Sequence, residues 1–353
     1  MTKKYTINCV GCGADLAYKP GTHSLACDYC GTMNEIPMVD FEIEELDLNE
    51  HLRVDKKRKK YKAEIITCPG CGAKETLDAD KSSSFCAYCG TPLVSGKIQQ
   101  EEIISPDYLL PFNLDKKQAL ERASQWLRGN WFVPNKLKRD AINYAHFKGV
   151  YLPFWTYDAD TYTRFTGQRG DTYYQEVRRG DKVQRIAKTR WSMAFNGQVH
   201  HFFDDTLIAA TTSLDKKYLD KLAPWDLHNL VPFKEDYLRG FITEKFHIGL
   251  RDGFQKAKSR MESAITQMVK RQIGGDKQRI LNQQTKWSKL TFKHILLPVY
   301  VSSFQYKGKK YQFIVNSRTG EVQGQKPLSP FKIALVVIGI LSLLALLYYI
   351  KNG

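Results

Sequence analysis

The residues best suited to chemistry in this chain are eight cysteines, arranged as four copies of the five-residue pattern CxxCG. They divide into two sets of four: Cys9, Cys12, Cys27 and Cys30, then Cys68, Cys71, Cys86 and Cys89. Fourteen residues separate the two CxxC pairs within each set, and every cysteine of the first set recurs 59 positions later. The chain therefore contains a duplicated module with four thiols.

Four thiols in two CxxC turns are the ligand set of a structural zinc site. Each turn directs two sulfurs at one ion, and the second turn completes the tetrahedron that Zn²⁺ prefers. A glycine follows each pair, where a positive φ turns backbone amides toward the thiolates. We predict two structural Zn²⁺ ions in two tandem zinc ribbons, without an open coordination position for catalysis.

A disulfide framework is the alternative interpretation of the eight cysteines. The N-terminal sequence MTKKYTINCVGC has no apolar stretch long enough for a signal peptide, which favours a reducing compartment. A redox CxxC is typically a single motif beside a βαβ pattern, unlike four regularly spaced pairs. The sequence therefore favours zinc.

The C-terminal segment Phe331 to Ile350 reads FKIALVVIGILSLLALLYYI, with Lys332 as its one charged residue. The eighteen uncharged residues after Lys332, at about 1.5 Å each, cover roughly 27 Å, close to the hydrocarbon thickness of a bilayer. Because three residues follow, we expect a tail anchor: one transmembrane helix holds the chain in the cell membrane, and the bulk of the chain stays cytoplasmic. Lys326 and Lys332 flank the inner side.

The composition indicates a folded, basic protein. The chain has 353 residues, 42% of them hydrophobic, and a formal net charge of +16. Such a charge favours acidic partners, either nucleic acid or an anionic membrane surface. The stretch from Arg251 to Lys293 has eleven Lys and Arg against three acids. A solvated helix face, membrane apposition and nucleic-acid binding all fit this stretch.

We predict a multi-domain chain: zinc ribbon 1 (1–39), a charged linker (40–62), zinc ribbon 2 (63–97), an α+β body (98–325) and the membrane anchor (326–353). In the linker, an acidic block precedes the run KKRKKYK. A short helix or a solvated linker explains these charges. The alternative is a functional one, in which the basic run binds phosphate of lipid or nucleic acid.

The body shows signs of an internal duplication. LPF (110–112) resembles VPF (231–233), and FKGVYLPFW (147–155) resembles FKHILLPVY (292–300). We expect antiparallel sheets and two amphipathic helices. The first helix has Asp115 as its N-cap, and its buried face is formed by Ala119, Ala123, Trp126 and Leu127. The second helix covers about 249–271. Expected strands include 157–165 and 190–203, and Lys307-Gly308 is a hairpin turn.

The sequence HHFFDD at 200–205 is the one polar cluster that resembles a catalytic or metal constellation. Strand alternation would place His200 and Asp204 on one face, and His201 and Asp205 on the other. The end of a strand that continues into a loop would explain the same polar residues without a functional site. There is no phosphate-binding loop at 274–277 and no GxSxG. We therefore expect no catalytic residues, and a protein that is not an enzyme.

Three phrases resemble a known family: GVYLPFWTYDADTYTRFTGQRGD (149–171), HFFDDTLIAA (201–210) and YQFIVNSRTGEVQGQKPLS (311–329). With the CxxCG modules and the terminal span, they are similar to bacterial double-zinc-ribbon membrane proteins, often labelled primosomal helicases. This chain has no Walker lysine to match that label.

The resemblance implies gene neighbours and partners of three kinds: a phage-shock protein A-like protein, an SPFH-domain protein and a TPM-domain protein. It also implies a role in envelope stress. We therefore expect a membrane-anchored scaffold or adaptor that binds protein partners, with the eight cysteines as its site residues. The alternative is a nucleic-acid-binding zinc-ribbon protein held at the membrane.

Overall fold

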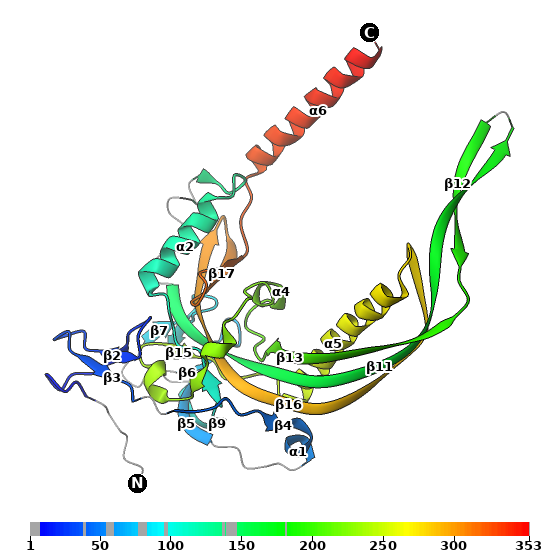
Figure 1. The fold of residues 1–353 in the computed structure, drawn as a ribbon. Helices are drawn as coiled ribbons and strands as arrows, with labels where there is room; N and C mark the ends of the chain where they lie inside the picture. Colours follow the sequence, from blue (N-terminus) through cyan, green and yellow to red (C-terminus); the bar gives the residue numbers. More distant parts are fainter. Residues whose placement is uncertain are drawn as a thin grey trace.

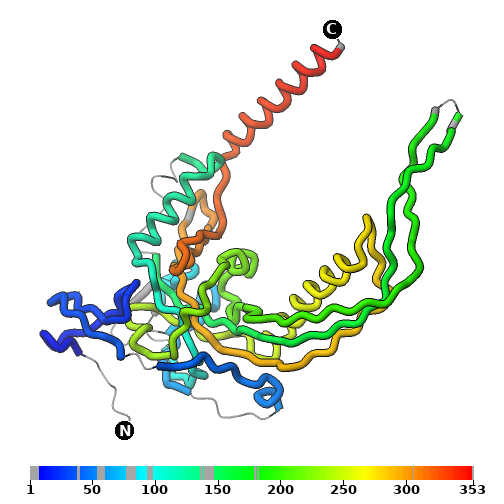
Figure 2. Tube along the Cα trace, viewed as in Figure 1, coloured from blue at the N-terminus to red at the C-terminus, as the bar shows by residue number. Residues whose placement is uncertain are grey.

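The computed structural model describes residues 8–37, 40–53, 60–76, 83–94, 98–135, 138, 147–180 and 182–352. The first cysteine set lies in a small three-stranded antiparallel sheet, here called module 1, made of β1 (Ala17–Tyr18), β2 (Ser24–Ala26) and β3 (Met33–Glu35). In Figure 2, module 1 is the blue region at one end of the body.

The second cysteine set lies in module 2, which has two small sheets. One has the order β6-β5-β9, and the other pairs β7 with β8. The bounds are β5 (Lys60–Thr67), β6 (Lys74–Thr76), β7 (Ser83–Phe85), β8 (Pro92–Val94) and β9 (Ile98–Ile104). Residues 60–62, assigned to the linker from sequence, thus begin β5, and β9, assigned to the body, pairs with β5.

The segment between the modules, here called the connector, is ordered where it meets the body. It contains β4 (Leu46–Asp47) and α1 (Leu48–Arg53), and β4 pairs with β16 (Lys277–Tyr306). Leu48 is fully buried. The short-helix interpretation of the linker therefore holds for α1, whereas the first four residues of the KKRKKYK run, at 56–59, lie outside the described residues.

The body is built on one ten-stranded sheet with the path β12-β11-β16-β10-β14. Besides β16, its strands are β10 (Tyr108–Leu109), β11 (Phe147–Arg179), β12 (Lys182–Trp191), β13 (Phe195–Ala209), β14 (Val231–Pro232), β15 (Ile242–Thr243), β17 (Lys309–Asn316) and β18 (Val322–Gly324), with β4 added. Most pairs are antiparallel, but β10 with β16 and β11 with β15 are parallel. The sheet is mixed, which corrects the expectation of antiparallel sheets alone.

The duplicated phrases lie side by side in this sheet. FKGVYLPFW of β11 runs antiparallel to the matching part of β16, with Tyr151 opposite Pro298, and Leu109 of β10 faces Val231 of β14. The sheet is covered on both faces here. Val150 and Leu152 belong to a core shared with module 2, whereas Phe147 and Tyr151 belong to a core shared with module 1. Burial on both faces explains why the phrase is continuously apolar.

Helices pack on the sheet as their sequence periodicity predicts. They are α2 (Lys116–Arg128), α4 (Lys216–Leu219) and α5 (Leu250–Ile273), with 3-10 turns η3 (Leu227–Asn229) and η4 (Glu235–Leu238). The capping box of Asp115 and Gln118 is present in α2. Trp126 is only partly buried. In α5, the buried stripe extends to Val269 and Ile273, beyond the predicted end.

The long strands give the body an extended shape (Figure 1). The strands β11 and β16 curve across the body, α5 lies along their concave side, and the hairpin of β11 and β12 projects away as an arm. The expected strand 190–203 is two strands, because β12 ends at Trp191 and β13 begins at Phe195. The terminal helix α6 (Pro330–Asn352) also projects from the body.

Candidate metal centres

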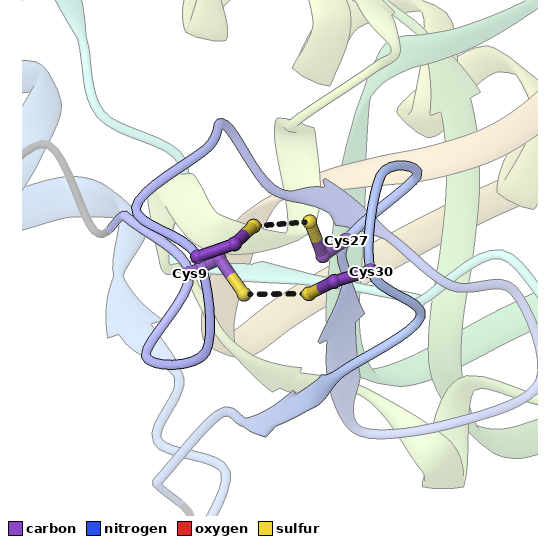
Figure 3. Close-up of side chains that lie close together, drawn as sticks. Cys9, Cys27 and Cys30 are labelled. Carbon is purple, nitrogen blue, oxygen red and sulfur yellow. Dashed lines mark hydrogen bonds between the residues drawn. The ribbon is translucent and has the colours of Figure 1, made fainter.

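The four cysteines of module 1 converge on one point. Sγ of Cys9 lies 3.4 Å from Sγ of Cys30, and Sγ of Cys12 lies 3.5 Å from Sγ of Cys27. Figure 3 shows the side chains of Cys9, Cys27 and Cys30 directed toward the same point. Disulfide sulfurs lie about 2.05 Å apart, whereas a tetrahedral ion with bonds of about 2.3 Å separates its sulfurs by about 3.8 Å. The geometry therefore fits a bound metal ion and not a pair of disulfides.

Module 2 repeats this arrangement. Sγ of Cys68 lies 3.5 Å from Sγ of Cys89, and Sγ of Cys71 lies 3.7 Å from Sγ of Cys86. In both modules, all four ligand atoms lie within 4.8 Å of one another, and all eight cysteines are free thiols. The structure thus brings together both predicted ligand sets, each able to bind one metal ion.

The glycines after the CxxC pairs shape the turns as the sequence predicts. Gly13 and Gly72 have φ of 75°, Gly31 has 74° and Gly90 has 69°. Each donates its N–H to the carbonyl of the first cysteine of its pair, as Gly13 does to Cys9 at 2.8 Å. This positive φ is strained for residues with a Cβ, so glycine at these positions lets the loop close around the sulfurs.

A threonine beside each site was missed from sequence. The Thr32 hydroxyl lies 3.1 Å from Sγ of Cys30, and the Thr91 hydroxyl lies 3.1 Å from Sγ of Cys89. Hydrogen bonds from the Thr32 side chain and backbone lower the pKa of Cys30 to about 6. Burial acts against ionisation of Cys89, but the Thr91 hydrogen bonds outweigh it and lower the pKa to about 7. The shared sequence CGT after the second turn of each module was the available signal.

The two modules differ at a position that the repeat aligns. Leu16 of module 1 corresponds, 59 residues later, to Glu75 of module 2, and both are buried. Oε1 of Glu75 lies 3.1 Å from Sγ of Cys86 and accepts a hydrogen bond from the Ala87 N–H at 3.1 Å. Burial raises the pKa of Glu75, because a carboxylate away from water is harder to ionise.

A second aligned pair shows how module 2 docks on the body. Tyr29 of module 1 is 84% exposed, whereas the equivalent Tyr88 is 3% exposed. The Tyr88 hydroxyl donates to the Glu244 carboxylate at 2.8 Å, and Thr211 donates to the same carboxylate at 2.7 Å. Burial raises the pKa of Glu244 to about 7. Module 2 is therefore fixed to the body through a buried polar network next to its ligand turn.

Module 1 docks on the opposite face of the sheet through aromatic and backbone contacts. The rings of Tyr18 and Tyr237 lie 5.2 Å apart, and the backbone N–H of Tyr18 donates to the Arg239 carbonyl at 3.1 Å. Gly21 donates to the Phe112 carbonyl at 2.9 Å. These contacts come from β1 and from the turn between β1 and β2, away from the two ligand turns.

The HHFFDD segment forms an ion-pair cluster. Asp158 of β11 faces both Asp204 and Asp205 at a bulge, where Asp205 has φ of 49°. Nζ of Lys293 lies 2.8 Å from the Asp205 carboxylate and 2.7 Å from that of Glu45, a connector residue. The bulge ends the simple alternation that the sequence pattern predicts. His200 instead contacts Asp160 at 2.7 Å.

Lys293 also corrects the interpretation of the basic stretch. Its side chain is 4% exposed and lies among carboxylates, so it is not part of a basic surface. Because its ammonium already neutralises charge among Glu45, Asp158 and Asp205, we interpret the cluster as a latch that holds the connector on the body.

Beside β15, the described residues line a cavity of about 10 Å³, room for one water molecule.

The terminal helix α6 is apolar around its whole circumference and stands free of the body. Within Pro330–Lys351, an 18-residue window has a mean hydropathy of 2.7 and no buried residue, so by length and composition the helix could span a membrane. At its start, Nζ of Lys332 donates to the carbonyls of Trp131 and Val133 at 2.9 and 3.0 Å. The predicted span, Phe331 to Ile350, lies within this helix.

The fold and sites define a class: two four-cysteine modules able to hold one metal ion each, docked on a mixed β-sheet body, with one apolar C-terminal helix. The chain is similar to the uncharacterized protein YdjG of Bacillus subtilis (strain 168). The two are 24% identical over 333 residues, which cover 94% of this chain and 93% of the relative. No family model matches the chain, and no solved structure matches it.

Proposed function

We propose that this chain is a membrane-anchored, non-enzymatic scaffold whose two four-cysteine modules are zinc ribbons, each holding one structural Zn²⁺. The observation that carries the proposal is the contrast between α6 and the rest of the chain. The first cysteine of each CxxC pair is buried in a core shared with the body, whereas α6 leaves its apolar surface exposed. The metal stabilises the fold, and the helix places it at a bilayer.

Zinc is the ion that this ligand set favours. Four thiolates in a tetrahedral arrangement select zinc or an iron–sulfur cluster, and sulfur separations of 3.4 to 3.7 Å match one central ion. With all four positions filled by cysteine, the ion has no open site at which to activate water. Its role in this proposal is therefore structural.

The scaffold role rests on the resemblance to double-zinc-ribbon membrane proteins and on the shape of the molecule. The expected partners are a phage-shock protein A-like protein, an SPFH-domain protein and a TPM-domain protein, assembled at the cytoplasmic membrane during envelope stress. The free thiols support a cytoplasmic body, because a reducing compartment preserves them for zinc. The exposed ligand turns of module 1, with Val10 at 83% and Tyr29 at 84% exposure, are available for such partners.

Affinity purification from detergent-solubilised membranes tests the scaffold. We expect the chain in the membrane fraction after alkaline washing, with stoichiometric protein partners that include the three classes named above. A matched chain that lacks residues 330–352 should be lost from the membrane fraction. Recovery of the full chain without a stoichiometric partner, both at rest and under envelope stress, would contradict the scaffold role.

Nucleic-acid binding is the second candidate, and the exposed basic face of α5 favours it. Lys256, Arg260 and Arg271 are exposed there. Titration of the detergent-solubilised chain against duplex and single-stranded DNA at rising salt separates the two functions. Specific binding that persists at physiological salt supports this second function, whereas weak binding with a steep salt dependence reduces it to nonspecific charge.

A further inference from the structure

The hairpin of β11 and β12 continues beyond the sheet as a free two-stranded arm, the name used here for residues 170–191, of which 170–180 and 182–191 are described. The strand β16 pairs with β11 as far as Gly170, and β13 pairs with it as far as Gly167. From Gly170 to Arg179, β11 pairs in register with β12, ending at Arg179 opposite Lys182. Among the described residues, no further strand pairs with this part of β11, so the arm projects alone (Figure 1).

The arm adds nothing to the hydrophobic cores. No described residue between 171 and 191 belongs to a core cluster, and most side chains there are exposed. Tyr174 is 63% exposed and Val183 is 61% exposed. A ribbon of this length without a buried face gains little stability from its own packing, so contacts outside the chain would stabilise it.

The surface of the arm is cationic and aromatic. Residues 170–191 contain six Lys and Arg against three acids, and one of those acids, Asp171, pairs with Arg169, just before the arm, at 2.9 Å. The guanidinium of Arg185 lies 5.5 Å from the Tyr174 ring, and that of Arg190 lies 5.3 Å from the Tyr173 ring. Exposed tyrosines among basic side chains suit a membrane interface, where aromatic rings sit at headgroup level.

The arm and α6 leave the body on the same side in Figure 1, and α5 lies between them. The bilayer that receives α6 therefore lies on the side toward which the arm extends. A ribbon with charged side chains and unpaired edges is excluded from hydrocarbon. Headgroups are the part of the bilayer that it can contact, and its positive charge selects the anionic ones.

We propose that the arm lies against the anionic lipid headgroups of the membrane that anchors α6, as a second contact between the body and the bilayer. This inference rests on the proposed membrane anchoring. It differs from anchoring in its chemistry, because it depends on lipid charge, whereas insertion of α6 depends on apolar area. The two dependences allow separate tests.

Trypsin protection of the full chain provides the test. The chain is inserted into preformed liposomes of phosphatidylcholine alone, or of phosphatidylcholine with phosphatidylglycerol, so that the body remains outside. We expect cleavage after Arg178 and Arg179 at the arm tip to be roughly tenfold slower with the anionic lipid, because apposed headgroups block the protease. Equal cleavage rates in the two liposomes overturn the proposal.

A neutralised arm makes the test specific. The variant Arg185→Gln with Lys188→Gln and Arg190→Gln keeps the tip cleavage sites and should lose the protection. The matched control, Arg53→Gln with Lys60→Gln and Lys62→Gln, makes the same charge change on α1 and β5, away from α6 (Figure 1). The control should keep the protection. Loss of protection in the control as well would show that overall charge, and not the arm, is responsible.

Two further measurements distinguish the lipid contact of the arm from membrane anchoring by α6 and from nucleic-acid binding. Alkaline extraction of the same liposomes tests α6: a chain that washes off refutes the anchoring, whereas an integrated chain with an unprotected arm refutes the arm contact alone. Duplex DNA added to the chain in detergent is the other comparison. If DNA protects the arm tip and anionic lipid does not, the arm binds nucleic acid and the lipid assignment is wrong.

Discussion

Module 1 and module 2 carry the same ligands at the same spacing but attach to the body in different ways. In module 2, the second ligand turn contacts the body directly, because the Tyr88 hydroxyl donates to Glu244. In module 1, the strands make the attachment and Tyr29 faces solvent. The duplicated four-cysteine module thus buries the tyrosine of its second ligand turn against the body in one copy and exposes the equivalent tyrosine in the other.

The same four-cysteine ligand set at the same spacing can therefore attach to the body in two different ways. Two features separate the copies: Glu75 stands where module 1 has Leu16, and Tyr88 is buried whereas Tyr29 is exposed. Buried polar groups are costly when they lose a partner. Module 2 should therefore be intolerant of change around its ligands, and module 1 should be tolerant except at the ligands themselves.

The largest expected effect comes from removal of a ligand. Cys27→Ser and Cys86→Ser each remove one metal site, and structural zinc contributes on the order of 10 kcal/mol of apparent binding free energy. We expect Cys86→Ser to weaken amide protection in the body further than Cys27→Ser, because it also removes the contact of Glu75 and disturbs the turn that holds Tyr88 against Glu244. Hydrogen exchange along β11 measures this, and equal losses would contradict the difference between the modules.

The aligned tyrosines give the next largest effect. Tyr88→Ala leaves a cavity and removes one of the donors to the buried Glu244 carboxylate, which should cost about 3 kcal/mol or more of unfolding free energy. The matched change Tyr29→Ala should stay within about 0.5 kcal/mol, because that side chain is exposed. Denaturant titration in detergent measures both. If Tyr29→Ala destabilises as much as Tyr88→Ala, module 1 is docked in the same way as module 2.

Thr32 and Thr91 make the same contact in both modules, so here we expect equal effects. Thr32→Val and Thr91→Val each remove a hydroxyl 3.1 Å from a ligand sulfur. Loss of such a partner typically lowers metal affinity about tenfold. We expect the two variants to weaken their own sites equally, since this contact is the same in both modules. Competition with a chromophoric chelator measures each site, and a large difference would mean that the local chemistry has diverged as well.

The smallest effect concerns the connector after module 1 and depends on pH. Burial and the Glu45 carboxylate raise the pKa of Asp158 to about 7. Burial opposes ionisation of Glu45, but hydrogen bonds from Asp158 and Lys293 outweigh it and lower its pKa to about 2. A neutral Asp158 therefore donates to ionised Glu45 and holds the connector on the body.

The sign follows from the raised pKa of Asp158. Its contribution to stability is fully present below the unfolded pKa of about 4 and is lost as pH rises through about 7. Amide exchange in residues 44–48, corrected for the intrinsic pH dependence, should increase between pH 5 and pH 8 relative to module 2. Asp158→Asn mimics the neutral carboxyl and should remove this increase. A pH dependence that survives in Asp158→Asn would refute the latch.

The sequence alone predicted the parts that follow local rules. The spacing of the cysteines and the glycines after them predicted both ligand sets and their turns. The capping box at Asp115 predicted the start of α2, and the Lys307-Gly308 turn predicted the hairpin of β16 and β17. In each case, neighbouring residues determine the conformation, so a single sequence contains the information.

The missed features depend on contacts between distant residues. Tyr29 and Tyr88 occupy the same position in the repeat, and only the docking of module 2 on Glu244 distinguishes them. Lys293 looks like one more basic residue until Glu45 and Asp205 are brought to it from other strands. The length of β11 was also missed, because its exposed arm lacks the alternation that a half-buried strand shows.

Whether each module of the membrane-anchored chain binds one Zn²⁺ can be measured by native mass spectrometry of the full chain, extracted from the membrane fraction into mild detergent. We expect the chain to carry two zinc ions, with one ion lost in Cys27→Ser and one in Cys86→Ser. A metal-free chain about 8 Da lighter than the reduced mass, as four disulfides would make it, would contradict the claim. So would the absence of the chain from the membrane fraction.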